Sequence, residues 1–364
     1  MKIESVDLQL SRIPLPKGPW GDQIHRVTDI EIVLVNVHAD TGLVGTGFSH
    51  TSGVGGRTIL AMCEELIPTL IGAEVNPQAV WHQAWQYLRD GGTGGITTLA
   101  LCGFDLALWD LLGQEYKLSL PSLLGQVHTR VPLYGSGINL NLDVDELVEQ
   151  VRGWQREGFF AGKVKVGKPD IEEDYFRLRK IREAVGDYPL MIDANQGWTY
   201  ARAQQAMKRF SDLNLYWVEE PFRVDDVASH ALLKRHIDTS IGLGENLYTL
   251  QDFNEYLIAD ACDFIQADVG RVGGITPYMD IAALGRAFNR PMIPHFLMEL
   301  SATILTAVPN MLGAEMTDGG TLTELGVIEP HEHENGYFVP RSAPGIGLEY
   351  DRDLLKQHAI AEVS

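Results

Sequence analysis

Short apolar segments recur along the C-terminal part of the chain at intervals of about 25 residues, and this repeat limits the possible folds more than any other feature. Strands that alternate with helices at this spacing predict βα units and a parallel sheet, and eight such units predict a closed (β/α) barrel. The eight predicted strands are Val131–Tyr134, Gly162–Val166, Leu190–Ala194, Leu215–Glu219, Ile241–Glu245, Phe264–Asp268, Met292–His295 and Met311–Glu315.

Segments with helical periodicity separate most of these strands, whereas no helical pattern follows the last strand before Val327. We therefore expect an α/β barrel that lacks its eighth helix. The predicted helices are Ile171–Val185, Tyr200–Arg209, Val227–His236, Leu250–Ala259 and Pro277–Phe288.

The N-terminal part follows another pattern, strands first and helices afterwards, which predicts a separate α+β domain. Asp29–Ala39 and Gly45–Ser49 are its clearest strands, and helices are expected at about 57–70, 77–89 and 97–114. The tail after Val327 is turn-rich and is expected to return to this first domain. The expected divisions are 1–127 for the N-terminal domain, 128–327 for the barrel and 328–364 for the returning segment.

The 364 residues include 49 Asp and Glu against 29 Lys and Arg, a net charge of −20. This charge repels phosphate backbones and anionic lipid surfaces, so neither nucleic acid nor membrane is an expected partner.

The longest apolar stretch, Thr97–Leu112, contains Asp105 and Asp110 and predicts a buried helix. Three cysteines without a CxxC, and an N-terminus without an apolar signal core, favour a cytoplasmic protein.

Ionisable residues stand at the C-terminal ends of six consecutive predicted strands. Asp193, Glu219 and Glu245 are each 26 residues apart, and Asp268, His295 and Glu315 end the next three strands. A single acidic residue at a strand end is commonly a helix cap or a solvated loop residue. Six in register indicate more, because the C-terminal ends of barrel strands surround one mouth where catalytic groups collect.

The first three of these carboxylates, Asp193, Glu219 and Glu245, are expected to converge. At about 4 Å apart they would repel by about 4 kcal/mol per pair, so the three pairs would cost as much as a domain's whole stability. A cation must therefore neutralise them. An all-oxygen set that leaves open positions suits Mg²⁺, which keeps some of its waters.

Two basic groups are predicted at the same mouth. Lys163 and Lys165 are two residues apart on one strand and share a face, either inside the barrel or snorkelling outward. Inside, each ammonium would lower the other's pKa and make one lysine a better base near neutral pH. His295 could be a satisfied core residue, but Asp268 on the preceding strand can bond one ring nitrogen and orient it.

These residues, in this order and spacing, resemble the enolase superfamily, specifically its mandelate racemase subgroup. The resemblance spans the chain and rests on the following motifs: GFDLALWD at 103–110, LPSLLG at 120–125, KVK at 163–165, DANQGW at 193–198, VEEP at 218–221, GEN at 244–246, RVGG at 271–274 and PHFLMEL at 294–300. It implies a capping domain, built from both termini, over a (β/α)7β TIM-like barrel. A homo-oligomer is also expected from the family.

The resemblance implies roles for single residues. Asp193, Glu219 and Glu245 would bind one Mg²⁺ per subunit, and Glu220 would not be a ligand. Lys165, tuned by Lys163, would act as a general base or acid on one face of the substrate, and His295 with Asp268 on the other. Glu315, in its protonated form, would hydrogen-bond the substrate carboxylate, and Asn195 would lie near the substrate. The N-terminal loops at about 14–26 and 50–57 are associated with specificity, which makes His25 and His50 candidate substrate-binding residues.

The implied chemistry begins with removal of the proton α to a carboxylate, which Mg²⁺ and a hydrogen-bond donor make possible by stabilising the enediolate. The motifs are most similar to the acid-sugar dehydratases, hydro-lyases that convert an aldonate or aldarate to a 2-keto-3-deoxy acid. A racemase or epimerase that uses Lys165 and His295 as a two-base pair is the alternative. A non-catalytic protein on the same scaffold is the third possibility, and the intact set of ionisable residues speaks against it.

One further cluster could be mistaken for a metal site. His331, Glu332, His333 and Glu334 follow one another and precede Asn335-Gly336, a signal for a hairpin turn. We interpret this cluster as a solvated turn.

Overall fold

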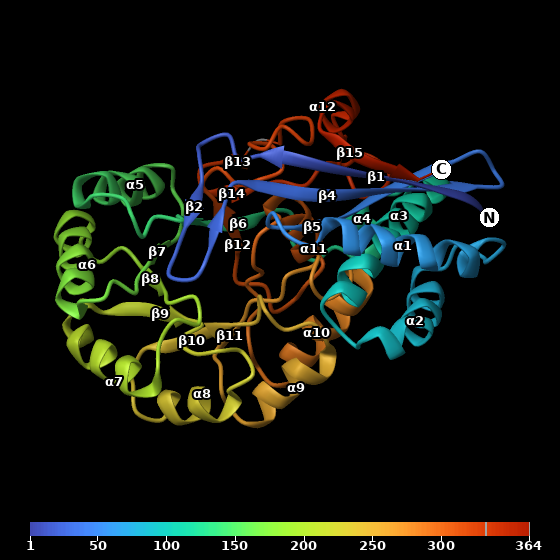
Figure 1. Ribbon diagram of the computed structural model, residues 1–364. Helices are drawn as coiled ribbons and strands as arrows, with labels where there is room; N and C mark the ends of the chain where they lie inside the picture. The colour runs from blue at the N-terminus through green and yellow to red at the C-terminus, as the bar shows by residue number, and fades with distance from the viewer. Residues whose placement is uncertain (332, 364) are drawn as a thin grey trace.

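The computed structural model describes residues 1–331 and 333–363. Two units lie side by side, a sheet with its helices and a ring of βα units (Figure 1). The sheet of the first unit is antiparallel and ordered β15-β1-β4-β5. Its strands are β1 (Ile3–Pro14), β4 (Asp29–Ala39), β5 (Val44–Thr51) and β15 (Ala359–Val363). Because β15 pairs with β1, the two ends of the chain meet in one sheet.

Two helices, α1 (Gly56–Leu70) and α3 (Ile96–Tyr116), pack on this sheet, and α2 (Pro77–Leu88) packs against both of them. The close approach of α3 to β5 requires glycine, since a Cβ on Gly45 would lie 2.1 Å from the Ala107 carbonyl oxygen and one on Gly47 would lie 2.2 Å from that of Gly103. Among the described residues α3 alone is long and apolar enough to cross a bilayer, but 72% of its most apolar stretch is buried inside the protein. It is the core helix of this unit.

The second unit is a parallel barrel. The strands pair in the order β11-β10-β9-β8-β7-β6, and β12 pairs with β6 in parallel. Met292 closes the ring, because it forms single bridges with Ile265 of β11 and with Met311 just before β12. The strands are β6 (Val131–Ser136), β7 (Gly162–Lys165), β8 (Leu190–Asp193), β9 (Leu215–Glu219), β10 (Ser240–Leu243), β11 (Phe264–Ile265) and β12 (Ala314–Thr317).

Seven helices of the described chain alternate with these strands, and most of them form an outer layer at the left and lower parts of Figure 1. No helix follows β12 before Val327 in the described chain, so the fold is a (β/α)7β barrel beneath a capping domain. The helices are α5 (Val144–Arg156), α6 (Ile171–Val185), α7 (Tyr200–Arg209), α8 (Val227–Lys234), α9 (Leu250–Ile258), α10 (Ile275–Ala287) and α11 (Met298–Leu305).

The barrel differs from the sequence pattern in three places. Of the predicted strand Phe264–Asp268, only Phe264–Ile265 forms β11. The stretch Met292–His295 forms only a bridge at Met292 instead of a strand. The helix α11 that follows it was not predicted. Every residue of Met298–Leu305 is buried, the polar Glu299, Ser301 and Thr303 included, so no solvent-exposed polar face marks a helical period.

The tail divides between the two units. The short hairpin of β13 (His333–Glu334) and β14 (Tyr337–Phe338) pairs with β6 of the barrel, and α12 (Arg352–Gln357) then leads to β15 in the capping sheet. His331, expected in a solvated turn, is instead buried beside Phe338, and its Nε2 contacts the Val339 carbonyl. Glu332 lies outside the described residues.

A buried carboxylate joins the two units. Asp105 on α3 accepts hydrogen bonds from the backbone N–H of Thr276 at 3.0 Å and from its hydroxyl at 2.5 Å. Thr276 lies in the first turn of α10, whose N-cap Gly274 has no side chain to offer. A Cβ on Gly274 would lie 2.4 Å from the Asp105 carboxylate. The capping domain thus supplies the helix cap of a barrel helix.

We expect Asp105→Ala to lower the free energy of unfolding by about 2 kcal/mol, because the partly buried N–H and hydroxyl of Thr276 lose their acceptor. Urea denaturation of Asp105→Ala and of Asp40→Ala, an exposed acceptor from Lys2, gives the comparison. Equal losses in the two variants would contradict a special role for the interdomain cap.

Candidate active site

Three acidic side chains meet at the mouth of the barrel, the C-terminal ends of its strands. Asp193 ends β8, Glu219 ends β9 and Glu245 follows β10, and in the register of the sheet Lys165, Asp193 and Glu219 are successive neighbours. One carboxylate oxygen of each acid lies within 4.8 Å of the others, and all three side chains are buried. This carboxylate triad is an all-oxygen donor set that can hold a divalent cation.

Both lysines of β7 point into the barrel. The Lys163 Nζ lies 2.8 Å from a Glu315 oxygen and contacts Glu219, and the Lys165 Nζ lies 2.5 Å from the Asp193 Oδ2. Both side chains are almost wholly buried. Lys163 and Lys165 therefore lie inside the barrel, and neither snorkels outward.

The expected lowering of a lysine pKa is not found. Burial and the charge of Lys163 lower the pKa of Lys165, but Asp193 and the neighbouring carboxylates outweigh them, and the net pKa is raised. Against burial, Glu219 and Glu315 hold the pKa of Lys163 well above its usual value. Two ammoniums alone would lower each other's pKa, but the carboxylates around them raise it, and a bound divalent cation would offset the charge of those carboxylates.

His295 and Asp268 form the predicted pair. The His295 Nδ1 lies 2.8 Å from the Asp268 Oδ2, and its Nε2 lies 3.3 Å from the Glu245 Oε2. Burial lowers the pKa of His295, but Glu245 and the bond to Asp268 outweigh it, so the pKa is raised. Lysine and histidine thus stand at opposite ends of the carboxylate triad, Lys165 beside Asp193 and His295 beside Glu245.

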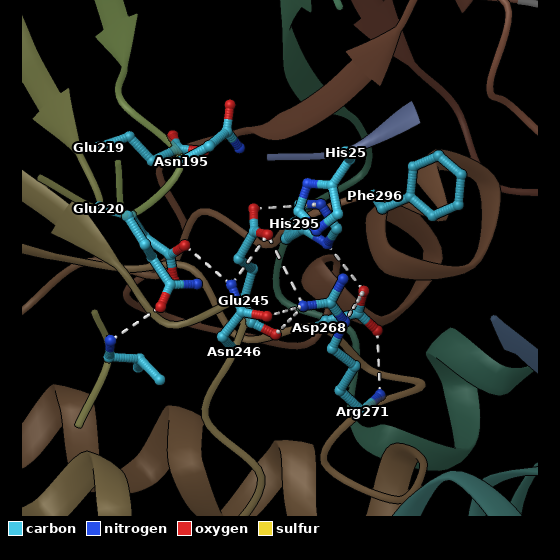
Figure 2. Close-up of polar contacts among 12 residues, drawn as sticks. His25, Asn195, Glu219, Glu220, Glu245, Asn246, Asp268, Arg271, His295 and Phe296 are labelled. Carbon is cyan, nitrogen blue, oxygen red and sulfur yellow. Dashed lines mark hydrogen bonds and ion pairs between the residues drawn. The ribbon is translucent and has the colours of Figure 1, made fainter. Parts of the chain in front are cut away.

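Arg271 was not among the predicted site residues, although the RVGG motif contains it. Its guanidinium donates to the Glu245 carbonyl at 3.0 Å and to the Asn246 side chain at 2.5 Å, and it lies 3.9 Å from the Asp268 Oδ2. Figure 2 shows it between Glu245 and the Asp268–His295 pair. Gln266 is a second omission, and it donates to Glu219 at 2.5 Å. Neither residue stands at the C-terminal end of a predicted strand, the position by which the other site residues are predicted.

A cavity opens above the triad, with walls from both units. His25 and His50 come from the capping domain, and Asn195 and Arg271 come from barrel loops. His50 is buried, which lowers its pKa to about 4, and its Nδ1 has no hydrogen-bond partner. His25 is half-exposed, and its bond to Asp22 raises its pKa. All the predicted substrate-binding residues therefore line one space.

Comparison with known proteins agrees with this geometry. Residues 8–125 match the mandelate racemase/muconate lactonizing enzyme N-terminal domain, and residues 146–354 match the enolase C-terminal domain-like family. The chain belongs to the enolase superfamily. It is 34% identical to 3,6-anhydro-alpha-L-galactonate cycloisomerase of Streptomyces coelicolor over 98% of this chain and 99% of that protein.

Two acid-sugar dehydratases are also similar to this member of the enolase superfamily. The L-talarate/galactarate dehydratase of Salmonella typhimurium is 33% identical over 85% of this chain and 79% of that one. The crystal structure of L-talarate dehydratase from Polaromonas sp. JS666, complexed with Mg and L-glucarate, superposes with a TM-score of 0.92 at 31% identity, covering 100% of this chain and 98% of that one.

The charge of Glu315 in this structure depends on its neighbours. Burial raises its pKa, but Lys163 and His295 outweigh burial and lower the pKa to about 2. Its Oε2 also accepts the Phe296 N–H at 2.7 Å. The ammonium of Lys163 directly against the carboxylate is the physical reason for the lowered pKa. The protonation of Glu315 when substrate binds stays a prediction.

The carboxylate triad predicts a metal-dependent gain in stability. For protein freed of metal with a chelator, Mg²⁺ at 100 times its dissociation constant should raise the free energy of unfolding by about 2.7 kcal/mol. Glu245→Gln should lose most of this gain, because one charged ligand is gone. Thermal unfolding with and without Mg²⁺ measures both effects.

Glu220→Gln is the matched control, since Glu220 is buried beside the triad and accepts from Asn246 at 2.8 Å but is not part of the cluster. It should keep most of the gain. Equal losses in the two variants would argue against Glu245 as a ligand.

His50 predicts a pH dependence of stability. Its pKa falls from 6.5 in the unfolded chain to about 4 in the fold. A lowered folded pKa contributes stability that is fully present above pH 6.5 and is lost as the pH falls toward 4. His50→Asn should therefore reduce the loss of unfolding free energy over this window by up to about 3 kcal/mol. Urea denaturation at several pH values measures it, with exposed His82→Asn as the control.

Proposed function

We propose that this enzyme is a Mg²⁺-dependent dehydratase of an acid sugar, an aldonate or aldarate, that yields a 2-keto-3-deoxy acid. The observation that carries the proposal is the position of Lys165 and His295 at the two ends of the carboxylate triad, below a cavity lined by polar groups. The likeness to acid-sugar dehydratases over most of the chain supports the choice of substrate class.

In this proposal Asp193, Glu219 and Glu245 hold Mg²⁺, which supplies positive charge where the substrate carboxylate becomes more negative. Lys165 Nζ or His295 Nε2 removes the α-proton, and the other group protonates the departing β-hydroxyl so that water leaves. Asp268 keeps His295 oriented through Nδ1. Asn195, His25 and His50 are proposed to bind the substrate in the cavity.

Lys163 and Glu315 act as a pair in this scheme. Their contact at 2.8 Å holds Glu315 ionised before substrate arrives. A substrate carboxylate that binds beside Lys163 would weaken this contact and favour a proton on Glu315, which could then donate a hydrogen bond as charge builds.

Two other outcomes use the same residues. Return of a proton to the opposite face by the second base would make the enzyme a racemase or epimerase. The 34% identity to a cycloisomerase of an anhydro acid sugar favours testing substrates in which the β-oxygen belongs to a ring ether instead of a hydroxyl. In that case the same proton removal would break a ring C–O bond.

A library of monoacid, diacid and anhydro acid sugars, assayed for 2-keto products with Mg²⁺, tests the proposal. Incubation in D₂O separates the outcomes: a 2-keto product supports dehydration, whereas deuterium incorporation with inversion and no keto product supports racemisation. Product formed only from anhydro acids would support the cycloisomerase reaction.

We expect Lys165→Ala and His295→Asn each to lower kcat by about 10²–10⁴-fold, the usual worth of a general acid or base. Lys168→Ala, a lysine on the same βα unit outside the cavity, is the control and should keep activity near that of the parent. Activity of both site variants within about threefold of the parent would sink the proposed roles.

We also propose that the enzyme works in the cytoplasm as a homo-oligomer. Its cysteines Cys63, Cys102 and Cys262 are all buried and unpaired, as suits a reducing compartment. Light scattering of the purified protein measures the oligomeric state.

A further inference from the structure

A small hairpin of the capping domain lies over the barrel mouth. Its strands are β2 (Trp20–Gly21) and β3 (Arg26–Val27), and its turn, residues 22–25, carries Asp22, Gln23 and His25. Asp22 braces the turn by accepting the backbone N–H groups of Ile24 at 2.7 Å and His25 at 2.8 Å. Asp22 and His25 line the cavity above the triad.

The Gln23 side chain joins this turn to the barrel. Its amide nitrogen donates one hydrogen bond to the Val166 carbonyl at 3.0 Å and another to the Ala194 carbonyl at 2.9 Å. Val166 follows Lys165, and Ala194 follows Asp193, so the two acceptors are the strand ends that carry a proposed acid–base group and a proposed metal ligand. Both amide hydrogens are used.

Two glycines make room for this side chain. A Cβ on Gly167 would lie 1.7 Å from the Gln23 amide nitrogen, and a Cβ on Gly197 would lie 2.3 Å from its oxygen. Any other residue at either position would collide with Gln23. The amide therefore occupies a close-fitting space between two barrel loops, and both of its N–H groups have a backbone carbonyl as acceptor.

The base of the hairpin has its own contact with the barrel. Trp20 packs edge-on against Phe296 with ring centroids 6.0 Å apart, beside Gly320. Phe296 directly follows His295. The hairpin is thus held at two places, by apolar packing at its base and by the Gln23 hydrogen bonds at its tip, and the tip lies above the strands of Lys165 and Asp193.

We propose that Gln23 is a positioning residue, a latch that holds the 20–27 hairpin closed over the bound acid sugar and keeps His25 facing the cavity. This proposal rests on the proposed function for its substrate, but the latch itself is a property of the fold. Because the Gln23 amide holds the hairpin on the strand ends, substrate must enter while the hydrogen bonds from Gln23 to Val166 and Ala194 are broken.

The most informative variant is Gln23→Glu. It keeps the size of the side chain, but its carboxylate cannot donate to the two carbonyl oxygens and is repelled by them. Gln23→Ala removes the donors and the bulk together. Ile24→Ala is the matched control, because Ile24 lies in the same turn and its side chain is 56% exposed. None of these residues is a proposed acid, base or metal ligand.

Limited proteolysis tests the latch without any need for turnover. Arg26 is exposed at the start of β3 and is a site for trypsin. Cleavage after Arg26 should be about tenfold faster in Gln23→Glu and Gln23→Ala than in the parent, since two hydrogen bonds no longer hold the turn. Ile24→Ala should match the parent, and the thermal midpoint should be unchanged in all variants.

Kinetics test the consequence for substrate. With an acid sugar that the parent turns over, both Gln23 variants should raise KM about tenfold and change kcat by less than about threefold, because closure contributes to binding more than to proton transfer. Gly197→Ala should produce the same effects by filling the space that the Gln23 amide occupies, and it should add little to Gln23→Ala, because the colliding side chain is already gone.

Unchanged cleavage at Arg26 together with unchanged KM in Gln23→Glu would overturn the latch. Faster cleavage in a protein that turns over no acid sugar would support the latch and count against the proposed function instead. The two proposals therefore fail by different measurements.

Discussion

The charge balance inside the barrel mouth is the constraint on which the rest of the structure depends. Three buried carboxylates meet there, and two buried lysines face them from the neighbouring strand. Buried charges of one sign are too costly to keep without partners, so the lysines must point inward and a divalent cation has a place in the middle. The same balance explains why neither lysine has a lowered pKa here.

The residues around the mouth link these charges to one another and form a cavity above them. Arg271 spans Glu245 and Asp268, so the triad and the histidine pair belong to one hydrogen-bonded network (Figure 2). The capping domain supplies the roof, fixed to the barrel by the Asp105 cap on α10 and by Gln23 at the strand ends.

The barrel and the set of ionisable residues could be predicted because both follow from local periodicity. Parallel strands place their C-terminal ends together, so a carboxylate at each end, 26 residues apart, already implies a cluster. The helix α11 could not be predicted, since complete burial leaves no solvent-exposed polar face to mark a helical period. Arg271 and Gln266 were missed because they lie off the strand-end register and act through contacts with other strands.

The sequence by itself determined the barrel and the side chains that carry chemistry at its mouth, because these depend on spacing along one chain. Only the tertiary structure decided the charge states of these side chains and the part of the capping domain that covers them. The ionised state of Glu315 on β12 depends on Lys163 on β7, two strands away, and the Gln23 side chain contacts residues 143 and 171 positions away along the chain. Contacts over such separations follow from the closure of the barrel and from packing between the two units, which no local pattern records.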